Sequence, residues 1–168
     1  MVQYLEWIEN TWFGIWVRES GSIWSYPMII TLHSYGMAML AGVSAVIDLR
    51  LLGFASRVPL ASLRRLFLLI RIGFWISLAS GIALTIGDAA TMLVSPIFYI
   101  KMVFVVLALV TVRVTERKVF GRPALGADVL PTHARALALS SLVFWLGSIT
   151  AGRLTAYLGP AAALKGLH

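Results

Sequence analysis

The chain has 168 residues, of which 60% are hydrophobic and only 12% are charged, and its mean hydropathy is +0.88. This composition excludes an ordinary water-soluble domain and predicts an integral membrane protein with one domain, residues 1–168. In a membrane protein, the net charge of +7 indicates attraction to anionic lipid headgroups and not a nucleic-acid partner. The absence of cysteine excludes disulfides, thiolate metal sites and thioether-linked haem.

Residues 1–24 predict an amphipathic helix that lies on the membrane surface. Apolar side chains recur there at helical spacing, at Leu5, Ile8, Trp12 and Ile15, and four of the six tryptophans fall in this segment. Glutamates interrupt the apolar pattern, so the segment is neither a span nor a signal peptide. We expect the helix to anchor the protein at the interface, and docking of a partner is the alternative.

Four apolar stretches are long enough to cross a bilayer, since a helix rises about 1.5 Å per residue and a span needs roughly 20 apolar residues. They cover about residues 26–47, 66–86, 96–114 and 134–158. Pro27 and Pro96 stand in the first turn of two of them, where the missing N–H has no intrahelical partner to lose. The predicted fold is therefore all-α: a polytopic membrane four-helix bundle preceded by an interfacial helix.

Basic residues predict the orientation of this bundle. Ten of the fourteen lysines and arginines lie in or beside two loops, the one before the second span and the one before the fourth. They are Arg50, Arg57, Arg64, Arg65, Arg71, Arg113, Arg117, Lys118, Arg122 and Arg135. The positive-inside rule places these loops in the cytoplasm, so both termini are predicted on the outer side of the membrane.

Three basic residues lie inside the predicted spans, where an unpaired charge is expensive: His33, Lys101 and Arg153. Counted from the outer ends of their helices at about 1.5 Å per residue, each lies roughly 8–9 Å deep. If their faces meet, they form a positive pocket in the outer half of the bundle, which calls for an anionic ligand or an acidic partner. The acid nearest that level is Asp88.

Small residues share the helix faces of these groups. The stripe on the first span comprises Ile30, His33, Gly36, Met37, Leu40 and Ser44, and that on the second comprises Gly73, Ser77, Gly81, Leu84 and Asp88. Small side chains let either another helix or a flat ligand approach closely. Helix packing explains the glycines alone, whereas a buried imidazole together with two cations favours a ligand.

These features predict b-type haem as the cofactor. His33 would ligate the iron, the small Gly36 would leave room for the macrocycle, and Lys101 and Arg153 would pair with the two propionates. Bare copper or zinc fits less well, because three histidines and no cysteine make a poor ligand set.

The other histidines do not complete such a site. His133 stands at the cytoplasmic start of the fourth span, about a bilayer away from His33, and His168 is the last residue. The iron would be five-coordinate or would take a methionine as its further ligand, with Met28, Met37 and Met92 as the candidates.

Each ionisable residue also has a structural interpretation. His33 could donate a hydrogen bond to a neighbouring helix, and Lys101 and Arg153 could extend toward the interface. Asp48, at the inner end of the first span, is expected to form a structural ion pair with Arg50 or with the next loop.

The stretches "LHSYGMAMLAGVSAVIDLRLLG", "SPIFYIKMVFVVLALV" and "AGRLTAYLG" resemble an uncharacterised family of bacterial four-helix membrane proteins over nearly the whole chain. More remotely, the first-span histidine and the Lys101 segment resemble copper-resistance D domains and HemJ-type protoporphyrinogen oxidases. The latter resemblance implies porphyrin or haem binding, with that family's histidine and lysine at His33 and Lys101. Its other functional residues have no match in this sequence.

Three hypotheses of function follow. The first is a small b-haem protein that passes electrons to a quinone or a redox protein. The second is a membrane enzyme that acts on a porphyrin. The third is a cofactor-free transporter or accessory subunit whose pocket takes an anionic substrate or lipid headgroup. All three place the chain in the lipid bilayer, and each is compatible with a homo-oligomer.

Overall fold

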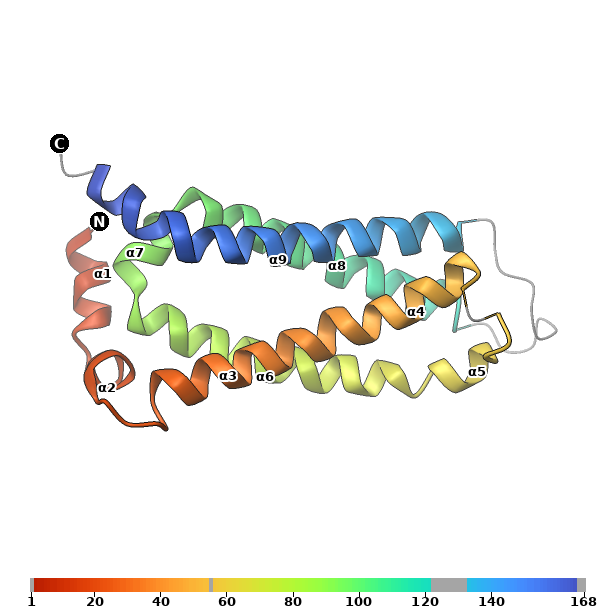
Figure 1. Cartoon of the computed structure of the whole chain (residues 1–168), viewed down its shortest axis with the longest axis horizontal. Helices are drawn as coiled ribbons and strands as arrows, with labels where there is room; N and C mark the ends of the chain where they lie inside the picture. Colours follow the sequence, from red (N-terminus) through yellow and green to blue (C-terminus); the bar gives the residue numbers. More distant parts are fainter. Residues whose placement is uncertain (1, 55, 122–132, 166–168) are drawn as a thin grey trace.

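The computed structural model describes residues 2–54, 56–121 and 133–165, with the side chains of 3–54, 56–121 and 133–155. These residues are mostly helical and contain no strand. In chain order the elements are α1 (Val2–Glu9), α2 (Trp12–Glu19), α3 (Tyr26–Met37), the π-helix η1 (Ala38–Gly42), α4 (Val43–Leu52), α5 (Leu60–Leu63), α6 (Leu66–Gly87), α7 (Ala89–Val94), α8 (Pro96–Lys118) and α9 (Ala134–Lys165) (Figure 1).

Four helical stretches are long and apolar enough to cross a membrane: Tyr26–Leu52, Leu60–Gly87, Pro96–Lys118 and Ala134–Thr155. They confirm the predicted all-α, multi-pass membrane bundle. The first and third continue past their predicted ends, because hydropathy marks the apolar part of a helix while the polar last turns remain helical. The first span stops at Gly53, whose φ of 107° is the left-handed conformation that commonly ends a helix.

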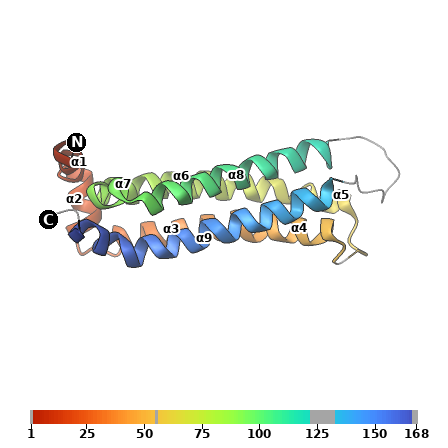
Figure 2. The same cartoon turned by 90° about the horizontal axis from the view of Figure 1, so that it is seen from above.

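The spans pack chiefly as two pairs, α3 with α6 and α8 with α9, while α4 crosses to α9 (Figures 1 and 2). The helices α1, α2 and α7 and the last turns of α9 gather at one end of the bundle, which we call the termini end. The opposite end, with α5 and the last turns of α4 and α8, is the loop end. Buried side chains of the apolar core include Leu40, Ile47, Leu51, Phe67, Ile70, Phe120 and Trp145.

The first span changes its packing partner at η1. Before η1, a Cβ added to Gly36 would lie 2.7 Å from the Ser77 nitrogen, and one added to Gly73 would lie 2.9 Å from the Gly36 oxygen. The glycines therefore let the backbones of α3 and α6 touch. After η1, α4 directs Ile47 and Leu51 into the core beside α9.

The N-terminal segment forms two short helices rather than the single helix that its periodicity predicts. The chain breaks at Thr11, whose side chain caps α2 by accepting a hydrogen bond from the Gly14 nitrogen at 3.3 Å. The turn is tight, and a Cβ on Gly14 would collide with the Glu9 carbonyl oxygen. Capping chemistry thus overrides a helical period that continues across the break.

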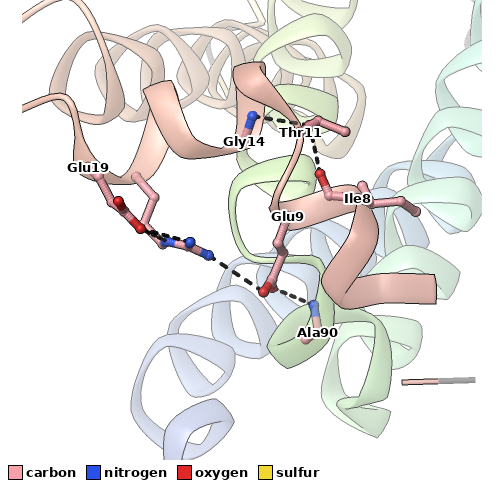
Figure 3. A network of polar contacts seen from close by, with 7 residues as sticks. Ile8, Glu9, Thr11, Gly14, Glu19 and Ala90 are labelled. Atoms are coloured by element: carbon pink, nitrogen blue, oxygen red, sulfur yellow. Dashed lines mark hydrogen bonds and ion pairs between the residues drawn. The ribbon is translucent and has the colours of Figure 1, made fainter. Parts of the chain in front are cut away.

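Both short helices dock on the bundle where α6 meets α7 (Figure 3). The Glu9 carboxylate accepts a hydrogen bond from the Ala90 nitrogen at 2.6 Å and lies 3.5 Å from Arg18. Val17, only 1% exposed, fills the space beside Gly87. The exposed aromatic residues of the segment are Tyr4, Trp7, Trp12 and Trp24. The segment is therefore fixed to the protein's own helices, with aromatic side chains left on its outer face.

Candidate functional site

His33 is held against α6 by one ring nitrogen. Its Nδ1 lies 3.1 Å from the Ser77 carbonyl oxygen and 3.2 Å from the Ser80 hydroxyl. A carbonyl can only accept, and the Ser80 hydroxyl already donates to the Ile76 carbonyl at 2.6 Å. Both contacts therefore assign the proton to Nδ1. In the neutral imidazole this leaves Nε2 with a free lone pair, and among the described residues Nε2 has no hydrogen-bond partner.

The imidazole fits there because α6 presents small residues to it. A Cβ added to Gly81 would lie 3.2 Å from His33 Cε1, so a larger residue would press on the ring. The small-residue stripe predicted on the second span thus has two uses in the structure. Gly73 allows the close contact between α3 and α6. Gly81, Ser77 and Ser80 lie beside the imidazole ring, and we call these three residues the seat of His33.

Lys101 approaches the same region from α8. Its side chain lies over Gly152 of α9, with Cε 3.7 Å and Nζ 4.0 Å from the position that a Cβ there would occupy. It lies in the same region of the bundle as His33, and no hydrogen bond joins the two side chains. Lys101 is partly buried, and in the described part of the chain it has neither an ion-pair nor a hydrogen-bond partner. The structure thus brings two of the predicted site residues together from different helix pairs.

The other two predicted site residues have different surroundings. Gly36 is buried in the contact between α3 and α6, and this contact accounts for a glycine at that position. Arg153 follows Gly152 and so lies at the level of Lys101, but its side chain is exposed, with no partner among the described residues.

The remaining candidates among the described residues do not contribute a hydrogen bond to His33. Asp88 is exposed where α6 meets α7, and His133 is exposed beside the first turn of α9, at the loop end. Met37 packs against the apolar core. His168 and Arg122 lie outside the described residues.

Asp48, which we expected in a structural ion pair, is buried in the loop half of the bundle. Its side chain is 3% exposed, and its Oδ2 has no hydrogen-bond partner. The predicted pair with Arg50 is not formed. Arg50 instead donates a hydrogen bond from Nε to the Val58 carbonyl at 2.7 Å, so it contacts the following loop through a backbone group and not through an ion pair.

Hydroxyl groups surround the Asp48 carboxyl. Ser44, Thr115 and Ser141 are 2%, 2% and 1% exposed, and their hydroxyl oxygens also lack partners. Ser44, Asp48 and Thr115 line a cavity of about 10 Å³, which is at the lower limit for one water molecule. The predicted first span ends at residue 47, so it does not place Asp48 inside the bundle. The available signal was the spacing of Ser44 and Asp48, which are four residues apart and so lie on one helix face.

One family matches the sequence. The chain belongs to a family of unknown function (DUF6644), whose match covers residues 4–158 and so includes His33, Asp48, Lys101 and Arg153. No curated protein and no solved structure matches the chain. The resemblance to copper-resistance D domains and HemJ-type oxidases is not part of this match and stays a prediction. The family description names no activity, so the argument for function rests on the site.

Proposed function

We propose that the protein binds b-type haem through His33 and transfers electrons across part of the membrane. The observation that carries the proposal is the anchored imidazole. A histidine that ligates a metal commonly donates its other ring N–H to a carbonyl or carboxylate, which fixes the tautomer and aims the free nitrogen. The bonds from His33 Nδ1 to α6 meet this requirement and leave Nε2 available.

Haem suits this donor set better than a bare metal ion. In the described residues no group of three or more potential protein ligands lies together. A metal at His33 would therefore need to bring most of its donors with it, as the iron of haem does. When bound, haem supplies one-electron redox chemistry, and the protein supplies the axial imidazole and the electrostatic surroundings.

Lys101 and Arg153 would then form ion pairs with the two haem propionates. Lys101 is a partly buried cation without a described partner, and Arg153 lies beside the glycine over which Lys101 extends. Two carboxylates would give both cations a counter-charge, and charge-assisted hydrogen bonds to carboxylates are among the stronger ones. Gly36 would contribute indirectly, by allowing the close approach of α6 that seats His33.

The proposed location is a bacterial inner membrane, with both termini on the periplasmic side. The loop end carries Arg57, Arg64, Arg113 and Arg117, and such a concentration of arginine favours the cytoplasmic side. The His33 site would then open toward the periplasmic half, where a quinone or a redox protein could exchange electrons. A homo-oligomer is compatible with this arrangement.

An absorption spectrum of the purified protein tests the proposal. Protein made with ample haem should show a Soret band, which His33→Ala should abolish and His133→Ala, a control at the exposed loop-end histidine, should leave unchanged. Lys101→Met should release haem faster without removing the axial ligand. Wild-type protein that purifies colourless and stays so on haem titration would overturn the proposal.

An anionic ligand without a metal is the second candidate, and the unpartnered Lys101 favours it specifically. A substrate carboxylate or a lipid headgroup could neutralise Lys101 and Arg153, with His33 as a hydrogen-bonding neighbour. Colourless protein whose melting temperature rises with such an anion, and no longer does so in Lys101→Met, would select this function.

A further inference from the structure

A second basic site lies at the loop end, away from His33. A groove of about 370 Å³ opens between α6 and α8, and its charged residues are Arg64, Arg71, Arg113, Glu116 and Arg117. Four positive charges thus face one negative charge within a single concavity. The groove is not part of the haem proposal, and it adjoins the Asp48 cavity, with which it shares Phe67.

The single acid does not neutralise this groove. Glu116 binds Arg113 at 2.7 Å and lies 3.9 Å from Arg71, so one carboxylate is shared between two arginines. Arg64 and Arg117 have no partner in the part of the chain that the structure describes. The side chains of Arg71 and Arg113 are 62% and 57% exposed, so they can reach a bound molecule.

Membrane orientation alone explains the number of arginines at this end but not their convergence. The positive-inside rule acts on loop composition and requires no shared site. Arg57 and Arg135 lie at the same end and outside the groove. The four groove arginines, in contrast, come from two segments far apart in sequence and face one space.

Two aromatic residues also line the groove. Phe67 and Phe120 pack edge to face with ring centroids 5.2 Å apart, and both are almost fully buried. The groove therefore combines four arginines with two aromatic residues of the apolar core. This combination suits a phosphate group held at the boundary between water and hydrocarbon.

We propose that this groove binds a phosphate-bearing anion, supplied either by a phospholipid headgroup of the adjacent leaflet or by a water-soluble phosphate. Arginine suits phosphate because its planar guanidinium donates two parallel hydrogen bonds to one group. Basic pockets between membrane helices bind anionic headgroups by the same chemistry. A bound phosphate would neutralise the excess positive charge of the groove. Glu116 would then hold Arg113 and Arg71 in position through its existing contacts with them.

The test measures ligand binding to the full-length protein in a non-ionic detergent. Short-chain phosphatidylglycerol, phosphatidylcholine and inorganic phosphate are titrated separately at constant ionic strength. The double variant Arg71→Gln/Arg113→Gln should bind phosphatidylglycerol at least tenfold more weakly, since each arginine contributes about fivefold. The matched control Arg57→Gln/Arg135→Gln loses the same charge outside the groove and should bind as the wild type does.

Glu116→Gln provides a change of opposite sign, which loss of folding cannot imitate. It removes the competing carboxylate and should tighten phosphatidylglycerol binding several-fold. Inorganic phosphate that binds with the same arginine dependence identifies a soluble phosphate as the source, and binding of the lipid alone identifies the headgroup. Equal weakening in both double variants, or no binding of either phosphate, overturns the proposal. None of these outcomes depends on whether the protein binds haem.

Discussion

In the termini half of the bundle, α3 packs on α6 through glycines, and the basic side chains within the spans are His33, Lys101 and Arg153. In the loop half, α4 packs on α9, and the buried charged side chains are Asp48 and Arg50, the latter bonded to the Val58 carbonyl. Fifteen residues of one span separate His33 from Asp48, which is about 22 Å at 1.5 Å per residue. The basic side chains beside His33 therefore cannot neutralise Asp48, so the buried charges of each half need partners within that half.

This contrast explains why the halves call for different partners. Lys101, without a described partner, favours an anionic ligand in the termini half. Asp48 lies among hydroxyl groups that can donate hydrogen bonds to it but cannot cancel a charge. The division falls at η1, where the first span exchanges α6 for α9 as its neighbour.

The largest expected effect comes from filling the glycine contact of the termini half. Gly36→Val would push side-chain atoms into the α6 backbone, where even a Cβ lies 2.7 Å from the Ser77 nitrogen. We expect a loss of about 3 kcal/mol in the free energy of unfolding in detergent. Gly42→Val is the matched control in the same span, because nothing lies within 4 Å of a Cβ at that position. Equal losses from both would remove the distinction between the halves.

The sequence predicted the four spans, their polar loops and the common level of His33 and Lys101, because these follow from composition and helical rise. It could not predict which faces meet. The stripe from Ile30 to Ser44 assumed one regular helix, but η1 interrupts it, so Gly36 faces α6 while Ser44 lies in the core of the loop half. At 3.6 residues per turn, one extra residue rotates the following faces by about 100°.

Directions of single side chains were also beyond the sequence. Arg153 shares the level of Lys101, yet it is exposed while Lys101 is partly buried. Lys101 lies over Gly152, and Arg153, the next residue of α9, points to a different side of that helix. Asp48 was assigned to an ion pair because Arg50 is near in sequence. In the structure Arg50 reaches the Val58 carbonyl instead, and only packing of α4 on its neighbours decides between these outcomes.

A smaller effect is expected in the loop half. Asp48→Asn keeps the side-chain volume but removes a carboxyl whose Oδ2 is buried without a partner. We expect the free energy of unfolding to rise by about 1 kcal/mol, because burial of an uncompensated carboxylate is more unfavourable than burial of a neutral amide. Asp88→Asn, at an exposed site, should change it by less than about 0.5 kcal/mol. A large loss from Asp48→Asn would mean instead that the carboxylate is held by a cation or an ordered water in the cavity.

The smallest effect should come from the seat of His33. Ser80→Ala removes one of two acceptors for Nδ1–H, while the Ser77 carbonyl at 3.1 Å remains. We expect a loss of about 0.5 kcal/mol in the free energy of unfolding, at the low end for one hydrogen bond because the Ser77 carbonyl still accepts from Nδ1. The protonated ring nitrogen should not change, which nitrogen NMR of histidine-labelled protein can identify. Ser34→Ala is the control, since that hydroxyl bonds to the Ile30 carbonyl and not to the ring.

The same spectrum separates the two proposed functions. A proton on Nδ1 that survives in Ser80→Ala leaves the lone pair of Nε2 free, as an iron ligand requires. A proton on Nε2 in the wild type would turn that nitrogen into a donor. His33 could then serve an anion beside Lys101 but could not ligate a metal through Nε2, so the anionic-ligand function would replace the haem proposal.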